Sequence, residues 1–428
     1  MTKLNAPLYN AVKEYVAKRP TRFHMPGHKG RGRGIYRSAP YDVTELDFSD
    51  DLLCAEGVIK ECEELFSECY GTDNAFMFTN GATGGLFALL YAVKCRTDKI
   101  ILSKNTHKSV FNALSVLDIE PCFIEVSYSD GLPNPITVKD VKTALENYKD
   151  AGAVLITTPD YFGRACDCKA IKEVVGERLL IADAAHGAHL VFAGLSDRAE
   201  LYTDGAVLSL HKTLPCFTGA AVVTCNNNLS LDIVRARRLF HTSSPQYLTM
   251  VSMDYARAIT EKMGRHGYLK LHDKLRKLPF DKLDNYDFSR LVLRGGKELA
   301  FLLKCHNIYP ECVCGDYVVL ILSPHNFKHL KRIYRISKNV VKSCISDIAD
   351  APVLKRARSF GDCSGVACER ISLKDAEGRV LAEEVGLYPP GVPQFFRGEM
   401  IDKQCKEFMI EHKNSLFGVD SDEVTVLK

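Results

Sequence analysis

The chain has 428 residues, of which 46% are hydrophobic and 25% are charged. This balance is typical of a folded protein and excludes a long disordered or low-complexity chain. Lys and Arg together number 56 against 53 Asp and Glu, a net charge of +3, which gives no general case for binding nucleic acid or a membrane surface.

The first residues, MTKLNAPLYNAVKEYV, carry charged and polar side chains where a secretion signal needs an apolar block. The longest apolar run, Leu86 to Val93, is too short to cross a bilayer. We therefore expect a cytoplasmic protein with no membrane partner. None of the 16 cysteines pairs at C-x-x-C spacing, so we expect reduced, mostly buried thiols and no metal site.

Residues 1–41 are expected to form an N-terminal arm. Residues 15–41 contain seven Lys or Arg and no acid, with five glycines and prolines from Pro26 to Gly34. Such an arm could bind nucleic acid, but it has few aromatic side chains for stacking on bases. A solvated surface or a contact between subunits is the favoured interpretation, with no nucleic-acid partner.

From residue 42 to residue 283, short apolar runs alternate with helical patterns. The runs lack polar alternation, as strands buried on both faces do. Seven strands are predicted, at residues 75–78, 99–102, 122–126, 153–157, 179–182, 206–210 and 220–224. Helices are predicted at residues 85–94, 109–117, 138–147 and 168–177. This alternation predicts a large α/β domain with a mostly parallel central sheet.

A smaller C-terminal α/β domain is expected over residues 284–428. It follows a long helical stretch at 248–267, and it opens with the apolar run SRLVLRGG and a helix at 297–305. In the large domain, right-handed crossovers place the carboxyl ends of the parallel strands on one edge of the sheet. Polar residues that directly follow those strands are therefore the candidates for a functional site.

Two such features suit a phosphate and a planar ring. The segment TNGATGG at 79–85 opens a helix and offers free backbone N–H groups, which suit a phosphate. His107 follows the next strand in the segment SKNTHKS. Its imidazole could stack on a planar ring, or it could simply cap the helix that follows.

Two further features suit a cofactor with an aldehyde and a ring nitrogen. Asp183 ends a buried strand beside His186 and His189. This arrangement could form a metal site, a proton relay, or a carboxylate partner for a cationic ring nitrogen. Lys212 follows another buried strand, and a partly desolvated Lys can form a Schiff base with an aldehyde. Glycine-rich turn, Asp and Lys in this order match the needs of pyridoxal 5'-phosphate.

The sequence resembles the ornithine/lysine/arginine decarboxylase family in its short form, a group of fold-type I pyridoxal-phosphate enzymes. The resemblance implies an aspartate aminotransferase-like large domain. The segments that carry it are RFHMPGHKG (22–30), DVTEL (42–46), FTNGATGG (78–85), NTHKS (105–109), TTPDYFG (157–163), DAAHGAHL (183–190), SLHKT (209–213), TSSPQYLTMVSMDYAR (242–257) and YPPGVPQFFRGE (388–399).

The resemblance implies a role for each matching residue. Lys212 bonds the cofactor aldehyde, Asp183 pairs with the protonated pyridine nitrogen, and Glu399 helps to shape the substrate pocket. The residues assigned to the phosphate are Ala82, Thr83, Gly84, Ser209 and His211. The residues assigned to the faces and edge of the ring are His107, Ala185 and His186.

The chain departs from the family pattern at three positions. Ala184 stands where the family commonly has Glu, Gly219 where Gln is frequent, and Arg397 where Pro is common. None of the three replaces Lys212 or Asp183, so these departures bear on substrate choice more than on cofactor binding.

We expect decarboxylation of arginine, lysine or ornithine to an amine and CO2, a step of polyamine biosynthesis. Lys212 and His211 are the two candidate donors of the proton that replaces the carboxylate, and the sequence does not choose between them. An acid such as Glu399, or one in the stretch from Asp47 to Asp51, would suit a cationic substrate. An aminotransferase or other reaction at Cα is the alternative. Fold-type I sites lie between subunits, which implies a homodimer or a higher homo-oligomer.

Overall fold

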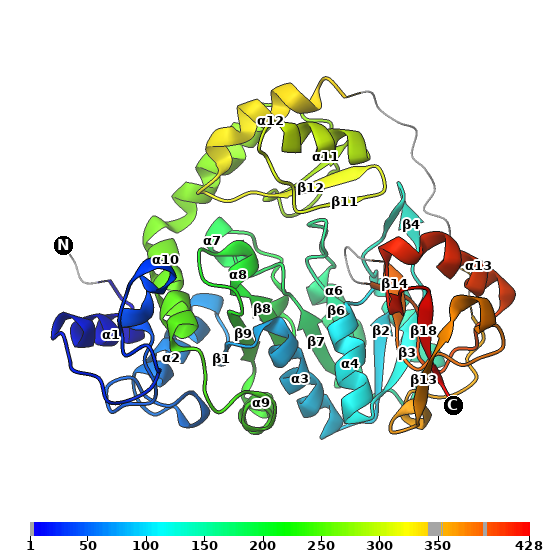
Figure 1. Cartoon of the computed structure of the whole chain (residues 1–428), viewed down its shortest axis with the longest axis horizontal. Helices are drawn as coiled ribbons and strands as arrows, with labels where there is room; N and C mark the ends of the chain where they lie inside the picture. Colours follow the sequence, from blue (N-terminus) through cyan, green and yellow to red (C-terminus); the bar gives the residue numbers. More distant parts are fainter. Residues whose placement is uncertain (1–3, 341–351, 353, 388–391) are drawn as a thin grey trace.

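The computed structural model describes residues 4–340, 352, 354–387 and 392–428. Its centre is a seven-stranded sheet with the order β1-β9-β8-β7-β6-β2-β3 (Figure 1). The strands are β1 Asn74–Phe78, β2 Lys99–Ser103, β3 Glu120–Ile124, β6 Ala153–Thr157, β7 Leu179–Asp183, β8 Gly205–Ser209 and β9 Ala221–Cys225. Strand β9 runs antiparallel to β1 and β8, and the other neighbouring pairs are parallel. Each predicted strand is present, with its ends within two residues of the prediction.

The sheet is covered on both faces, which explains the continuous apolar runs of its strands. Along β2, Ile100 and Leu102 belong to one hydrophobic core and Ile101 belongs to the other. The helices on the first face are α3 Gly81–Lys94, α4 Lys108–Leu117 and α9 Asn227–Phe240. The helices on the second face include α2 Val58–Tyr70, α5 Val138–Asn147 and α6 Cys168–Val175. The predicted α/β class with a mostly parallel sheet is confirmed.

The N-terminal segment differs from the loop that we expected. Pro7–Ala17 form helix α1, with proline in its first turn. Leu8 and Val12 lie one helical turn apart and are fully buried in the second core, because that spacing puts both on one helical face. The basic stretch after α1 remains irregular, apart from short 3-10 turns.

The expected single domain over residues 284–428 contains two separate cores (Figure 1). The first surrounds strands β10 Arg290–Arg294, β11 Cys312–Cys314 and β12 Tyr317–Ile321 with helices α11 Gly296–Cys305 and α12 Leu330–Ser337. The second is built by strands β13 Cys368–Ser372, β14 Val385–Leu387, β15 Val392–Phe395, β16 Leu416–Phe417, β17 Val419–Asp420 and β18 Glu423–Leu427 with helix α13 Lys403–His412. Figure 1 shows the first unit above the central sheet and the second beside α4 and β3. The division into two units follows from which strands pair with one another, and the pattern of apolar residues in the sequence does not reveal this pairing.

One long helix connects the large domain to the first of these units. Helix α10, Tyr247–Arg276, contributes Met250 to the core of the large domain and Leu271 to the core of the smaller unit. Its backbone leaves helical geometry at Gly264 (φ 58°, ψ −169°), where glycine tolerates the positive φ. Within the described residues, no helix has the length and apolar character needed to span a membrane.

Candidate active site

The carboxyl ends of β7 and β8 and the amino end of α3 surround a cavity of about 390 Å³. Strands β7 and β8 are parallel neighbours, with Asp183 opposite Val207, so the residues that end them lie close together. Lys212 follows β8 on the short helix α8, Leu210–Thr213. The predicted site residues that line this cavity are Ala82, Thr83, His107, Asp183, Ala185, His186, Ser209, His211 and Lys212.

The side chain of Lys212 is largely withdrawn from water. Its Nζ lies 3.2 Å from Nε2 of His186. Burial lowers the pKa of Lys212, and the charge of Arg290 acts in the same direction, while Asp183 opposes it. A lysine with a lowered pKa holds more of its amine in the unprotonated form, which is the form that attacks a carbonyl carbon.

His186 lies between Lys212 and a buried arginine. Nη2 of Arg290 is 2.9 Å from Nδ1 of the ring, and the ring meets that of Tyr161 nearly at a right angle, at 5.1 Å between centroids. Burial lowers the pKa of His186 well below its usual value, and the charges of Lys212 and Arg290 add to that effect. The imidazole is therefore neutral at physiological pH.

Asp183 is the last residue of β7 and is buried. Its Oδ1 accepts a hydrogen bond of 3.1 Å from the backbone N–H of Ala185. The negative charge of Asp183 also raises the pKa values of His107 and Lys212 against the larger effect of their burial. A carboxylate at the wall of a cavity suits a protonated ring nitrogen.

The amino end of α3 offers backbone donors to the cavity. Asn80 makes no side-chain cap to the first turn, so the N–H groups at Ala82 and Thr83 lack an intrahelical partner. Gly84 is buried and does not line the cavity. A Cβ at Gly84 would lie 2.0 Å from Oδ1 of Asn80, so its role is to let this turn close.

Two polar side chains, one from β8 and one from α8, also line this cavity. The hydroxyl of Ser209 is buried and has no hydrogen-bond partner among the described residues. Nδ1 of His211 lies 2.9 Å from the carbonyl oxygen of Ala220. Because that oxygen only accepts, Nδ1 carries the proton of this hydrogen bond, and Nε2 takes no part in it.

His107 both caps a helix and lines the cavity. As the N-cap of α4, its Nδ1 accepts a hydrogen bond of 3.2 Å from the backbone N–H of Ser109. Burial lowers the pKa of His107. The two functions suggested by the sequence are therefore compatible, because the cap uses one ring nitrogen and the residue also lines the cavity.

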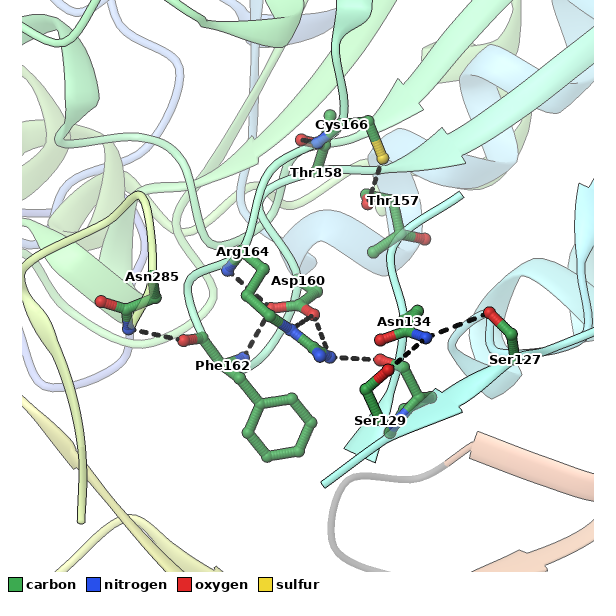
Figure 2. Close-up of polar contacts among 11 residues, drawn as sticks. Ser127, Ser129, Asn134, Thr157, Thr158, Asp160, Phe162, Arg164, Cys166 and Asn285 are labelled. Carbon is green, nitrogen blue, oxygen red and sulfur yellow. Dashed lines mark hydrogen bonds and ion pairs between the residues drawn. The ribbon is translucent and has the colours of Figure 1, made fainter. Parts of the chain in front are cut away.

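One wall of the cavity is a loop fixed by a buried carboxylate (Figure 2). Asp160 accepts hydrogen bonds of 2.9 Å from the backbone N–H groups of Phe162 and Arg164, and another of 2.9 Å from Nε of Arg164. Arg164 also donates to the carbonyl oxygen of Pro133 in the hairpin of β4 (Tyr128–Ser129) and β5 (Leu132–Pro133). Asp160 is therefore engaged in holding the wall.

The two histidines suggested as a metal site have different partners in the structure. His189 turns to Asp287 and Ser289, with Nε2 at 3.0 Å and 2.9 Å from their side-chain oxygens. Across the described ranges, no group of three or more His, Cys, Asp or Glu side chains is placed to hold a metal ion.

Comparison with known proteins places this site in a family. The family model for the major domain of Orn/Lys/Arg decarboxylases matches residues 6–290, and the model for their C-terminal domain matches residues 338–415. The chain belongs to the Orn/Lys/Arg decarboxylase family.

Two relatives align with nearly the whole length of this chain. It is 30% identical to the uncharacterized protein YaaO of Bacillus subtilis, over 94% of this chain and 93% of the relative. It is 27% identical to the arginine decarboxylase of Bacillus subtilis, over 100% of this chain and 97% of the relative.

Solved structures share the fold. The lysine decarboxylase LdcF of Francisella novicida gives a TM-score of 0.80 at 16% identity, over 100% of this chain and 82% of that one. The constitutive lysine decarboxylase of E. coli gives 0.77 at 17% identity, over 99% and 82%. The expected fold-type I class and the expected enzyme class, a decarboxylase of basic amino acids, are confirmed. The alternative, an aminotransferase, is not favoured.

The cavity of this decarboxylase fits pyridoxal phosphate in its chemistry. An unpartnered buried hydroxyl at Ser209 and the uncapped first turn of α3 suit a phosphate. A volume of about 390 Å³ lies within the usual range for small-molecule sites.

Sequence reasoning missed several residues of the decarboxylase site. Tyr161 and Thr157 line the cavity, and both lie in the motif TTPDYFG, which was noted without a role. Arg290 contacts His186 from the neighbouring unit. No local signal indicated this, because the contact joins residues 104 positions apart.

The acids suggested for the substrate do not line this cavity. Glu399 lines a second cavity of about 380 Å³, which shares Asn105 and Val392 with the first. Burial raises the pKa of Glu399 to about 7. Asp50 accepts backbone hydrogen bonds from three N–H groups in the loop before α2 and from that of Ile59 in the first turn of α2. Residues 388–391 of the motif YPPGVPQFFRGE lie outside the described residues.

Proposed function

We propose that this decarboxylase uses pyridoxal phosphate bound at Lys212 to remove the α-carboxylate of a basic amino acid. The observation that carries the proposal is the buried amine of Lys212, which lies in one cavity with Asp183 and with the amino end of α3. Family membership supports the reaction, and the geometry supports the assignment of residues.

The residues that would hold the cofactor have complementary charges. Asp183 would hold a proton on the pyridine nitrogen, and Lys212 would bond the aldehyde carbon. The residues proposed for the phosphate are Ala82, Thr83, Gly84, Ser209 and His211, of which Gly84 acts through the shape of the turn. His107, Ala185 and His186 would contact the faces and edge of the ring. Pyridoxal phosphate supplies an electron-withdrawing ring that stabilises the charge left on Cα when CO2 departs.

Two side chains are proposed as the source of the proton that Cα receives. Burial lowers the pKa of Lys212, so its ammonium form would give up a proton more readily than that of an exposed lysine. His211 has Nδ1 committed to the carbonyl oxygen of Ala220, so Nε2 is the nitrogen that exchanges protons. Retention of CO2 release with slowed product formation in His211→Gln would assign the donor to His211.

Arginine is the first substrate to test. The relatives named arginine decarboxylase cover nearly the whole chain. The cavity-lining Tyr161 donates a hydrogen bond of 2.9 Å to Glu311. The negative charge of Glu311 raises the pKa of Lys212, against the larger effect of burial. We propose that Glu311 attracts the cationic end of the substrate.

We further propose that the chain acts as a homodimer. Phe23 and Ile35, in the basic arm, are 93% and 90% exposed, and exposed apolar side chains of this size are typical of an interface. Sedimentation velocity should give a dimer for the native chain and a smaller species for the double variant Phe23→Ser/Ile35→Ser. A cytoplasmic location stays a prediction.

The central proposal is tested by spectroscopy and product analysis. The purified chain should show a visible absorbance band with pyridoxal phosphate, and this band should be absent in Lys212→Ala. It should release CO2 from arginine, lysine or ornithine, with the matching amine as product. A band with a keto acid as product would instead indicate transamination, and no band would contradict the assignment of the cofactor.

A further inference from the structure

A buried guanidinium group lies behind the proposed cofactor lysine. Arg290 begins β10, and its side chain is 1% exposed. Its Nη2 contacts Nδ1 of His186 at 2.9 Å. Its Nε and Nη1 are buried and make no hydrogen bond within the part of the chain that the structure describes. The charge of Arg290 contributes to lowering the pKa of the buried carboxyl of Asp287. A buried guanidinium with two nitrogens that make no hydrogen bond among the described residues is nevertheless costly, which points to a role beyond packing.

The surrounding backbone is shaped to hold this side chain. Gly163 has a φ of +81°, and a Cβ there would lie 2.8 Å from Cβ of Arg290. Asn285 donates hydrogen bonds of 2.8 Å to the carbonyl oxygens of Phe162 and Arg290, and Figure 2 shows the first of these. The N–H of Asp287 donates to the carbonyl oxygen of Gly163 at 2.8 Å. These bonds fix the backbone of the two loops that flank Arg290.

The position of Arg290 determines where the proton of His186 lies. A guanidinium has only donors, so Nδ1 of His186 must accept. The neutral ring therefore carries its proton on Nε2. That N–H points to Nζ of Lys212 at 3.2 Å, so the amine must accept, and only an unprotonated amine has the lone pair to do so.

We propose that Arg290 is a positioning residue that fixes the tautomer of His186 and thereby holds Lys212 as an unprotonated, nucleophilic amine. The proposal deepens the proposed function, because it explains how the residue assigned to bond the cofactor is kept reactive. Arg290 does not line the cavity, so it acts through His186.

The other charges around the pair are consistent with this role. Facing Lys212, the charges of Asp183 and Glu311 raise its pKa, but burial and Arg290 outweigh them. Burial is the main cause of the lowered pKa of His186, and Lys212, Arg290, His107 and His189 are the facing groups that lower it further when they carry a positive charge. The pKa values of both groups are therefore lowered, which favours the neutral forms that the hydrogen bond between them requires.

The protonation of Lys212 is measurable without the cofactor. The full chain freed of pyridoxal phosphate is treated with limiting acetic anhydride at a series of pH values. Only the unprotonated amine attacks the anhydride: the new N–C bond forms, acetate leaves and the amine loses a proton to water. Mass spectrometry gives the acetylation of Lys212 relative to the exposed Lys142, and its pH midpoint reports the pKa of Lys212.

Arg290→Met should raise that midpoint by about one pH unit, the size of effect that a nearby charge produces at a buried site. Arg290→Lys, which keeps a cation and a donor, should restore most of the native midpoint. Asn285→Ala is the matched control, because it loosens the same loop without removing the guanidinium, and it should leave the midpoint unchanged. An unchanged midpoint in a folded Arg290→Met variant would overturn the proposal.

A second pair of variants covers the case in which Arg290→Met does not fold. His186→Gln offers an acceptor to Arg290 and a donor to Lys212 and should keep a near-native midpoint, whereas His186→Leu should raise it. Equal midpoints for the two would contradict the role of the ring. This readout is separate from the test of function, which fails only if the native chain shows no visible band or no CO2.

Discussion

Arg397 donates two hydrogen bonds of 2.7 Å to the two carboxylate oxygens of Glu384, one from Nε and one from Nη2. Its third nitrogen, Nη1, donates to the hydroxyl of Ser115 on α4. Arg397 stands where the family commonly has proline. In this chain the substitution therefore ties the C-terminal unit to the large domain.

Removal of this arginine should destabilise the protein. The side chains of Arg397 and Glu384 are only 12% and 4% exposed, so Arg397→Met leaves a buried carboxylate without its partner. We expect a loss of about 3 kcal/mol in the free energy of unfolding, measured by urea denaturation. Arg397→Met/Glu384→Met should recover part of the loss, and an additive loss would contradict the pairing.

A glycine in α3 sets how closely that helix packs on the sheet. A Cβ at Gly85 would lie 2.6 Å from Val207 and 2.8 Å from Val223. Gly85→Ala should therefore lower the free energy of unfolding by about 1–3 kcal/mol through overpacking. Gly27→Ala, where a Cβ meets nothing within 4 Å, is the control and should change it by less than about 0.5 kcal/mol.

Glu399 should make stability depend on pH. Burial raises its pKa from the usual 4.5 to about 7, so the folded protein keeps a proton that the unfolded chain releases. Its contribution to stability is therefore lost as pH rises from about 4.5 to about 7, by about 3 kcal/mol in total.

The variant Glu399→Gln isolates this effect. Between pH 5 and pH 8, the free energy of unfolding should fall less in Glu399→Gln than in the native chain, because the amide does not titrate. Parallel curves for the two proteins would show that Glu399 ionises in the folded protein as it does in the unfolded chain.

Glu311 should govern the affinity for the substrate cation. Glu311→Gln keeps an acceptor for Tyr161 and removes the charge, so we expect KM for arginine to rise about tenfold, about 1.4 kcal/mol, with a smaller change in kcat. Tyr161→Phe keeps the charge and should raise KM less. Steady-state kinetics of CO2 release separate these effects, and an unchanged KM in Glu311→Gln would exclude this role.

The sequence predicted the large domain well because its strands are buried on both faces and read as unbroken apolar runs. The cavity residues Asp183, Ser209 and Lys212 could be predicted for the same reason, since each ends or follows such a strand. The helix at Pro7–Ala17 was not predicted, because the basic, acid-free stretch after it indicated an N-terminal arm over the first 41 residues.

The features of the site that the sequence did not predict depend on contacts between distant segments. Arg290 and Glu311 belong to a separate unit and reach the site only through its packing on the large domain. Glu399 carries the family motif but lies in the adjoining cavity. Motif position therefore identified the residues near the sheet edge and did not reveal which charges surround them.

The irregular backbone at Gly264 divides α10 between two units that both contribute charges near Lys212. His186 and Lys212 belong to the large domain, whereas Arg290 and Glu311 belong to the unit that α10 carries. A rotation of that unit about residue 264 would separate Arg290 from His186 and Glu311 from Tyr161, and would so change the charges that act on Lys212.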